Sequence, residues 1–397
     1  MSEHHHNKIK QFRRIRFLRD ILGIALTAFG GPQVHLTIIN KKLVQKRKYI
    51  SEDELKELNS LCNMLPGPTS TQTITAIGFK IGGPMLAFLS LAVWILPATL
   101  MMACFAMVVY FFNLNNPKLD FLKYLEPMAV AFIIYAAIKI RELFVHRIHH
   151  WILMTVAALI AILFTTPIIF PLILLTGGVA SSILKHSKND VKKIQNIDWR
   201  NFFLFIGIFL LAALLGGITK EKPFLLFENT YRYGSLVFGG GHVLIPMMYN
   251  QFVEFKHYLN ANEFIAGVGM LQAIPGPVFS FSTYAGALAL KDMGLLGLLL
   301  GSSIGTIAIF LPGTLLIFFI YPIWNQMKNF SPVKNAIEGI NATSAGLVIA
   351  SAFLLFQPLE VTSMNMLVLL ATLFLLLSTK IPYPLIVILC IAAGFIF

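Results

Sequence analysis

The chain has 397 residues, of which 57% are apolar and 12% are charged, and its mean hydropathy is +0.75. Soluble globular proteins carry roughly a quarter of charged residues, so this composition excludes that class. The formal net charge is +13. Basic residues that gather in loops between spans follow the positive-inside rule, and they can also attract an anion into a basic vestibule. No soluble domain is left over to present a basic face, so we expect no nucleic-acid partner.

Long runs without Asp, Glu, Lys or Arg cover most of the chain. A spanning helix needs roughly 20 such residues. Prolines at Pro167 and Pro382 divide two runs that are too long for one helix each. We therefore expect an all-α polytopic membrane protein with about 13 transmembrane helices, at 16–39, 54–79, 84–112, 122–143, 149–165, 167–184, 200–219, 224–249, 262–290, 294–321, 334–356, 361–378 and 381–397.

The two halves of the chain repeat one another. Phe29-Gly30-Gly31-Pro32 recurs as Phe238-Gly239-Gly240-Gly241, and Pro66-Gly67-Pro68 recurs as Pro275-Gly276-Pro277, both 209 positions later. A duplicated apolar chain with helix breakers inside its apolar segments is typical of secondary transporters. We expect a first transport repeat, a basic linker with a single connecting helix, and a second transport repeat, at 1–184, 185–223 and 224–397.

The single helix between the repeats bears on their orientation. If six helices are followed by one helix and then by six more, an odd number of membrane crossings separates equivalent helices. One half is then inverted relative to the other. If the segments 16–39 and 224–249 instead dip into the membrane and return on the same side, the repeats are parallel. The sequence leaves both arrangements open.

The Phe-Gly-Gly segments predict broken helices. Glycine weakens a helix, and proline removes a hydrogen-bond donor but fits the first position of a new helix. Gly30-Gly31-Pro32 therefore predicts a break and then a half-helix that begins near Pro32. The N-terminus of such a half-helix offers unpaired N–H groups and partial positive charge, which suit an anion. Close helix packing through glycine is the structural alternative.

The Pro-Gly-Pro segments are a second pair of breaks. Thr69 and Gln72 follow the first of them with hydroxyl and amide groups. These groups can bind substrate or bond back to their own helix. The second copy keeps the break but is less polar.

Several polar residues are predicted to lie deep in the membrane. Charges there are costly and usually face a cavity or a partner, so Arg232 can pair with a substrate anion or snorkel to the interface. His35 and His242 can carry protons or serve as hydrogen-bonded interior histidines. Asn63 and Gln272 lie three residues before each Pro-Gly-Pro. Together with the breakers, the residues predicted to bind substrate are Gly30, Gly31, Pro32, His35, Asn63, Pro66, Gly67, Pro68, Thr69, Gln72, Arg232, Gly239, Gly240, Gly241, His242, Gln272, Pro275, Gly276 and Pro277.

Catalytic and cofactor signals are weak. Gly301-Ser302-Ser303-Ile304-Gly305 fits a hydrolase pattern, but it lies mid-helix on a ladder of glycines spaced by four, which predicts a packing face. A membrane enzyme that uses Ser303 is therefore a remote hypothesis. Phosphate loops and the common zinc motifs are missing from the sequence, and we expect no enzyme activity, no cofactor and no metal site.

These motifs resemble the chromate transporter (CHR) family in its long two-domain form, and the match covers almost the whole chain. The resemblance rests on Ala28-Phe29-Gly30-Gly31-Pro32 with His35, Leu65-Pro66-Gly67-Pro68-Thr69 with Gln72, and their second-half copies. It implies a multi-pass carrier with inverted halves in the bacterial inner membrane that moves chromate, and sulfate as a further substrate, outward. Its partners would be the dianion and the lipid bilayer.

Some points stay open beside that resemblance. We expect the N-terminus on the cytoplasmic side. A passive or exchange-type channel or carrier for another small inorganic anion is the alternative function. The oligomeric state, a homo-oligomer included, cannot be read from the sequence.

Overall fold

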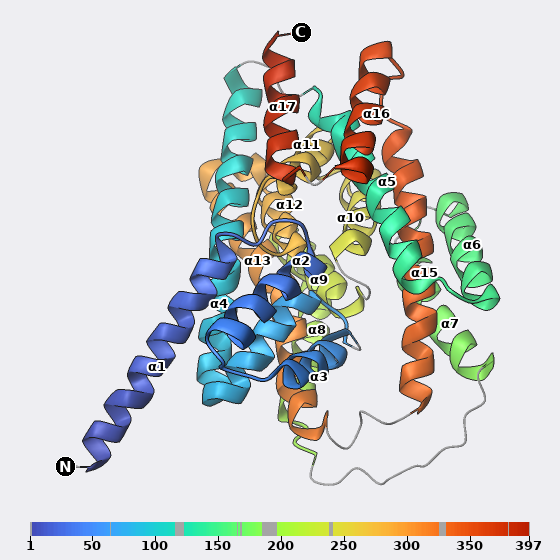
Figure 1. Cartoon of the computed structure of the whole chain (residues 1–397). Helices are drawn as coiled ribbons and strands as arrows, with labels where there is room; N and C mark the ends of the chain where they lie inside the picture. The colour runs from blue at the N-terminus through green and yellow to red at the C-terminus, as the bar shows by residue number, and fades with distance from the viewer. Residues whose placement is uncertain are drawn as a thin grey trace.

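The protein is described by a computed structural model that covers residues 2–63, 65–115, 123–164, 166, 169–184, 197–237, 241–324, 331–379 and 381–396. Within these ranges the chain is helical and has no strand (Figure 1). The prediction of an all-α protein is confirmed there. Among the described residues, four helical segments are long and apolar enough to cross a membrane, at Thr69–Phe112, Arg200–Thr219, Lys291–Ile323 and Asn335–Phe356.

The helices follow the predicted segments closely, with short breaks inside them. The first half contains α1 (Ser2–Ala25), α2 (Pro32–Ile39), the π-helix η1 (Asn40–Lys46), α3 (Glu52–Asn63), α4 (Thr69–Asn115), α5 (Leu125–Phe144), α6 (Ile148–Leu163) and α7 (Ile169–Leu184). After α8 (Arg200–Thr219), the second half contains α9 (Lys222–Leu236), α10 (Gly241–Tyr249), the π-helix η3 (Asn250–Phe255), α11 (Ala261–Leu271), η4 (Val278–Ser280), α12 (Phe281–Ala289), η5 (Lys291–Met293), α13 (Gly294–Ile320), η6 (Tyr321–Ile323), α15 (Ser331–Phe356), α16 (Ser363–Ser378) and α17 (Tyr383–Ile396).

One predicted boundary is wrong, and another is marked by a kink. The predicted span 16–39 is an apolar stretch, but α1 begins at Ser2, so the charged N-terminal residues continue the same helix. The predicted separation between the spans 54–79 and 84–112 is confirmed, because Gly82 and Gly83 have non-helical backbone angles and kink α4 there. Gly83 has a φ of 76°, a conformation that favours glycine, so the kink is encoded locally.

The duplication is visible in the backbone. Gly67 and Gly276, 209 positions apart, have φ values of 114° and 113°. Lys48 and His257 keep the same spacing and have φ values of 53° and 51°. Each half also has a π-helix after its broken helix. Equivalent sequence positions therefore adopt equivalent and unusual conformations.

The two halves are joined by a reciprocal pair of hydrogen bonds. The Gly67 N–H donates to the Val237 carbonyl oxygen at 2.7 Å, and the Gly276 N–H donates to the Ala28 carbonyl oxygen at 2.9 Å. Ala28 and Val237 are themselves 209 positions apart. Each Pro-Gly-Pro turn is thus bound to the residue that precedes the Phe-Gly-Gly motif of the other half.

Helices of the two halves also pack directly on one another. The second-half helix α15 lies against α5, α6 and α7 of the first half, on one side of the molecule (Figure 1). A Cβ added at Gly346 of α15 would overlap the Met154 carbonyl oxygen of α6. The glycine therefore lets the two helix backbones approach closely, as in other membrane helix pairs.

The predicted glycine ladder is a packing face, as expected. Gly297, Gly301 and Gly305 are buried in α13, which packs against α12. A Cβ added at Gly301 would overlap the Gly286 carbonyl oxygen of α12. Ser303, the only nucleophile considered above, donates its hydroxyl to the Leu299 carbonyl oxygen within its own helix, at 2.9 Å.

We predict that Gly301→Ala destabilises the protein by about 1–3 kcal/mol, because the added methyl must push α13 away from α12. The measurement is thermal unfolding of the purified protein in detergent. Gly207→Ala in α8 is the matched control, since no atom lies within 4 Å of its added Cβ. Equal stability of the two variants would show that the α12–α13 contact is not the tight one described.

Candidate functional site

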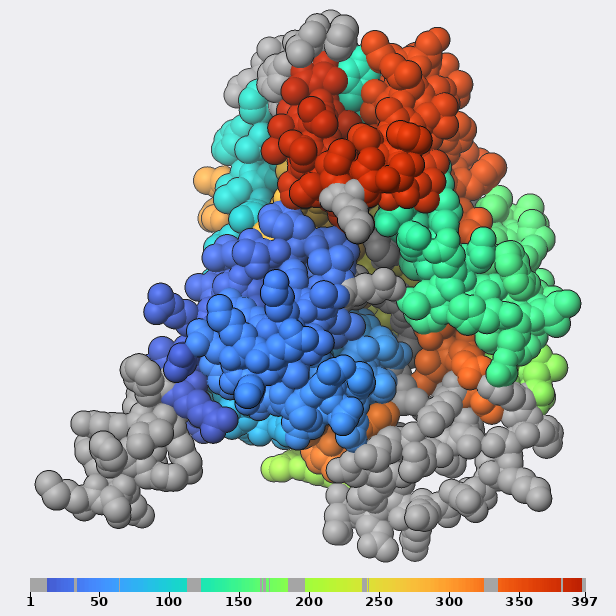
Figure 2. All heavy atoms as spheres, viewed as in Figure 1, coloured from blue at the N-terminus to red at the C-terminus, as the bar shows by residue number. Residues whose placement is uncertain are grey.

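A cavity of about 760 Å³ lies where the helix breaks of the two halves meet. Its walls include Gly30, Gly31, Asn63 and Thr69 from the first half, together with Gln272 and Gly276 from the second. Six of the residues predicted to bind substrate are therefore brought together, although they lie far apart in the sequence. Figure 2 shows the surface hollowed between the N-terminal segments, in blue, and α5, in green.

The break at Gly30 and Gly31 forms one wall of the cavity. Its backbone conformation is one that glycine adopts more readily than other residues. Gly30 and Gly31 have φ values of 101° and 83°. Gly31 is the N-cap of α2, which begins at Pro32 as the sequence predicted. No atom lies within 4 Å of a Cβ added at Gly31, so the backbone is open at this point. The first turn of α2 thus starts at the cavity wall.

The first Pro-Gly-Pro turn supplies a second helix start. α4 begins at Thr69, directly after Pro66, Gly67 and Pro68, and Thr69 lies on the cavity wall. Gln72 does not line the cavity. Its Nε2 donates to the Pro66 carbonyl oxygen at 2.7 Å, so this side chain closes the turn.

The second Pro-Gly-Pro turn is built differently. Pro275 and Pro277 flank Gly276, and Pro277 is the N-cap of the short 3-10 helix η4, which leads into α12. A Cβ added at Gly276 would lie 2.9 Å from the Cβ of Ala98, so this turn packs on α4. The equivalent of Thr69 is Val278, which also lines the cavity and makes this side less polar.

His35 is buried behind the cavity wall. Its Nδ1 lies 3.0 Å from the Ser70 hydroxyl oxygen, and its Nε2 lies 3.1 Å from the Ala28 carbonyl oxygen. The carbonyl can only accept, so Nε2 carries the proton and Nδ1 accepts from Ser70. His35 therefore links α2 to the start of α4 and to the Ala28 carbonyl.

The remaining predicted residues of the second half lie in different places. Gly239 and Gly240 fall outside the described residues, as does the side chain of His242. Gly241 begins α10, and a Cβ added there would overlap the Val278 side chain. The start of α10 therefore packs closely on η4.

Arg232 lies away from the cavity wall, in a polar cluster at α9. Its guanidinium is 3.5 Å from the Glu228 carboxylate and donates to Asn229 Oδ1 at 2.7 Å. Asn229 Oδ1 also accepts from Gln251 Nε2 at 3.0 Å. Arg232 is thus held by partners of its own chain in this structure.

Sequence reasoning missed the cation that does line the cavity. Lys139 of α5 is the only Lys or Arg among the described residues of its wall, and Tyr135, Asn341 and Tyr383 lie there as well. Lys139 Nζ is 2.9 Å from the Glu142 carboxylate and 5.9 Å from the centre of the Tyr135 ring. The available signal was a lysine inside the predicted span 122–143, to which the argument made for Arg232 also applies.

The arrangement combines the start of α2 and the start of α4 with amide side chains and one ammonium group in a space of small-molecule size. A family model described as chromate transporter matches residues 15–182 and 224–395. The chain belongs to the chromate transporter family. The two matched stretches contain the two sets of breakers that meet at the cavity.

Relatives of this family member are similar over most of their length. A chromate transport protein of Pseudomonas aeruginosa is 22% identical over 350 residues, covering 86% of this chain and 80% of its own. A probable chromate transport protein of Synechococcus elongatus is 22% identical over 385 residues, covering 95% and 93%. An uncharacterized transporter of Methanocaldococcus jannaschii is 26% identical over 389 residues, covering 96% and 94%. No solved structure matches the chain.

Proposed function

We propose that the protein is a secondary transporter that exports chromate, and sulfate as a second substrate, across the bacterial inner membrane and so gives chromate resistance. The family supports a chromate transport role, and relatives bear that printed name. The observation that carries the proposal is that the helix breaks of both halves line one cavity. Enzyme activity has no support among the described residues, since Ser303 is bonded within its own helix.

The cavity offers the groups that a tetrahedral dianion needs. The starts of α2 and α4 present backbone N–H groups and partial positive charge. Asn63, Gln272 and Thr69 add neutral hydrogen-bonding groups, and Lys139, which is paired with Glu142, adds an ammonium group. A lysine is a point charge that suits a substrate without a fixed planar face. In this proposal, His35 and Gln72 shape the cavity from behind its wall, because they bond to residues at or just before the starts of α2 and α4.

The charge of the substrate supports the proposed outward direction of transport. Moving one elementary charge through 100 mV corresponds to about 2.3 kcal/mol, so a dianion leaving a cell that is negative inside gains about 4.6 kcal/mol. Export can therefore be driven in part by the membrane potential. A carrier that alternates between two sides also fits a cavity built jointly by two repeats.

We also propose that the halves, 1–184 and 224–397, are inverted and that the segment 185–223 with α8 reverses the second half. The proposed arrangement has about 13 crossings and a cytoplasmic N-terminus. The reciprocal bonds of Gly67 and Gly276 support a two-fold relation between the halves.

Chromate flux tests the function. Inverted membrane vesicles that contain the protein are expected to take up radiolabelled chromate with saturation, and unlabelled sulfate is expected to compete. Vesicles without the protein are the control. A flux that rises linearly with chromate and follows voltage alone would indicate a channel, and no flux from correctly inserted protein would reject chromate as the substrate.

We predict that Lys139→Gln raises the half-saturating chromate concentration about 5- to 10-fold. A partly exposed charge contributes about 1 kcal/mol or slightly more to holding an anion, and 1.4 kcal/mol corresponds to a factor of ten. Lys139→Arg, which keeps the charge, is the matched control and is expected to transport with a much smaller change.

The variant Arg232→Gln distinguishes the role of Arg232 from that of Lys139. The position of Arg232 outside the cavity predicts an unchanged half-saturating concentration in this variant. A rise there, with none in Lys139→Gln, would transfer the substrate-binding role from Lys139 to Arg232.

Labelling of single cysteines tests the inversion. Lys48 and His257 are exposed and occupy equivalent positions, so Lys48→Cys and His257→Cys are expected to react with a membrane-impermeant maleimide from opposite sides. The background should carry Cys104→Ser, because Cys104 is exposed whereas Cys62 and Cys390 are buried. Labelling of both positions from one side would establish the parallel arrangement instead.

A further inference from the structure

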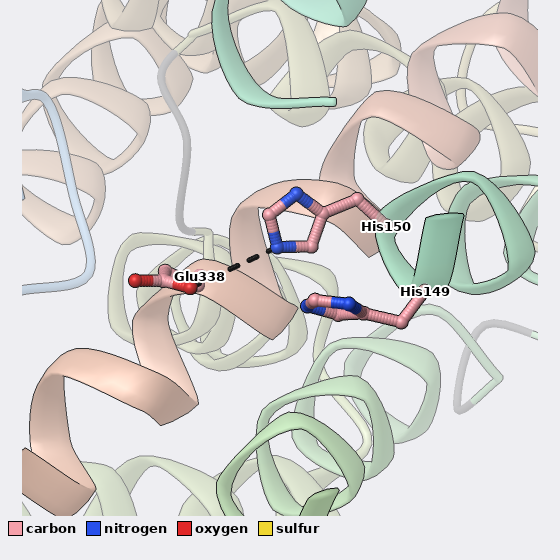
Figure 3. A group of neighbouring side chains, drawn as sticks. All are labelled: His149, His150 and Glu338. Atoms are coloured by element: carbon pink, nitrogen blue, oxygen red, sulfur yellow. Dashed lines mark ion pairs between the residues drawn. The ribbon is translucent and has the colours of Figure 1, made fainter. Parts of the chain in front are cut away.

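Three potential metal ligands meet at a junction of the two halves, away from the cavity wall. His149 and His150 lie in the first turn of α6, and Glu338 lies in the second turn of α15 (Figure 3). One donor atom from each of the three residues lies within 4.8 Å of the others. Among the described residues, this is the only such group of three His, Cys, Asp or Glu side chains.

The imidazole of His150 is buried and has unused hydrogen-bonding groups. It is 5% exposed, and both of its ring nitrogens are buried without a hydrogen-bond partner. Its Nε2 points toward Glu338 at 3.8 Å from Oε2, which is beyond hydrogen-bonding distance (Figure 3). A buried polar group without a partner costs about 1–3 kcal/mol, so an occupant that accepts electron pairs from the imidazole would stabilise the site.

The geometry is close to that of a metal centre. Zinc binds histidine nitrogen and carboxylate oxygen at about 2.0–2.2 Å, so two of its ligands cannot lie more than about 4.4 Å apart. The Nε2–Oε2 distance of 3.8 Å already meets this limit. The rings of His149 and His150 are 4.3 Å apart between centroids and nearly perpendicular, so small side-chain rotations can bring all three donors together.

We propose that His149, His150 and Glu338 form a binding site for a divalent transition-metal ion, with zinc as the best fit. Two imidazoles and one carboxylate are a set that zinc accepts, and a fourth position stays open to water or an anion. Calcium and magnesium prefer sites made of oxygen ligands and fit this set poorly.

The site would act as a cross-link between the halves. α6 belongs to the first half and α15 to the second, and they already pack backbone to backbone at Gly346. The carboxylate lies on the same helix as Asn341, which lines the cavity one turn further along. A bound ion would therefore fix α15 against α6 close to the substrate cavity.

Metal binding by the purified full-length protein tests the proposal. The N-terminal residues His4, His5 and His6 can bind metal on their own, so all three should first be changed to serine. After removal of metal with a chelator, titration with Zn²⁺ is expected to give one saturable site per chain. Titration with Co²⁺ is expected to give the visible absorption of a tetrahedral complex.

Glu338→Gln keeps the size of the side chain and is expected to weaken Zn²⁺ binding at least 10-fold, since even outer-sphere partners of metal sites contribute about 10- to 100-fold. His150→Ala is expected to abolish the site. His146→Ala is the matched control, because His146 is exposed nearby and bonds to the Leu143 carbonyl oxygen. Zn²⁺ is also expected to raise the unfolding temperature of the parent and not of His150→Ala.

Two results would overturn the proposal. One is the lack of saturable Zn²⁺ or Co²⁺ binding in the parent protein. The other is binding that is unchanged in both Glu338→Gln and His150→Ala while each variant unfolds cooperatively without metal. Both readouts are independent of chromate flux, so they separate this site from the transport proposal.

Discussion

The structure depends on a pair of backbone hydrogen bonds that cross between the two halves. Gly67 and Gly276 hold positive φ angles that turn their N–H groups toward the other half, where the Val237 and Ala28 carbonyl oxygens accept them. Backbone groups inside a membrane have no water to bond with. The N–H group of each turn therefore needs the carbonyl acceptor that the other half supplies. In this structure, each half supplies the acceptor for the turn of the other half, so the two halves complete one another.

The cavity is a direct product of that crossing. Because the Pro-Gly-Pro turn of each half is held beside the Phe-Gly-Gly break of the other, the interrupted helices gather at one place. The starts of α2 and α4 and the wall residues Asn63 and Gln272 therefore face a common space. Glycine, which provides no side chain, keeps that space open at Gly31.

The sequence allowed much of the fold to be predicted. α8 spans the predicted residues 200–219, and α2 begins at the predicted Pro32, because proline and glycine act locally on the backbone. The site was harder to predict. Arg232 was predicted to bind substrate and lies outside the cavity wall, bonded to Asn229 and paired with Glu228, whereas Lys139, which lines the wall, was overlooked. Which deep charge faces a cavity depends on the rotation of each helix, and His150 meets Glu338 only through long-range packing that no local pattern records.

The two crossing bonds are alike in geometry but not in their surroundings. The Ala28 carbonyl oxygen lies within hydrogen-bonding distance of both the Gly276 N–H and His35 Nε2. The position equivalent to His35 in the second half is Leu244, which has no donor side chain. If the Gly276–Ala28 bond opens, the Ala28 carbonyl oxygen keeps its hydrogen bond to His35 Nε2, and the leucine at the equivalent second-half position cannot supply such a bond to Val237. The two copies of the fold are therefore chemically unlike at the points where they cross, because a histidine side chain reinforces only the acceptor of the first half.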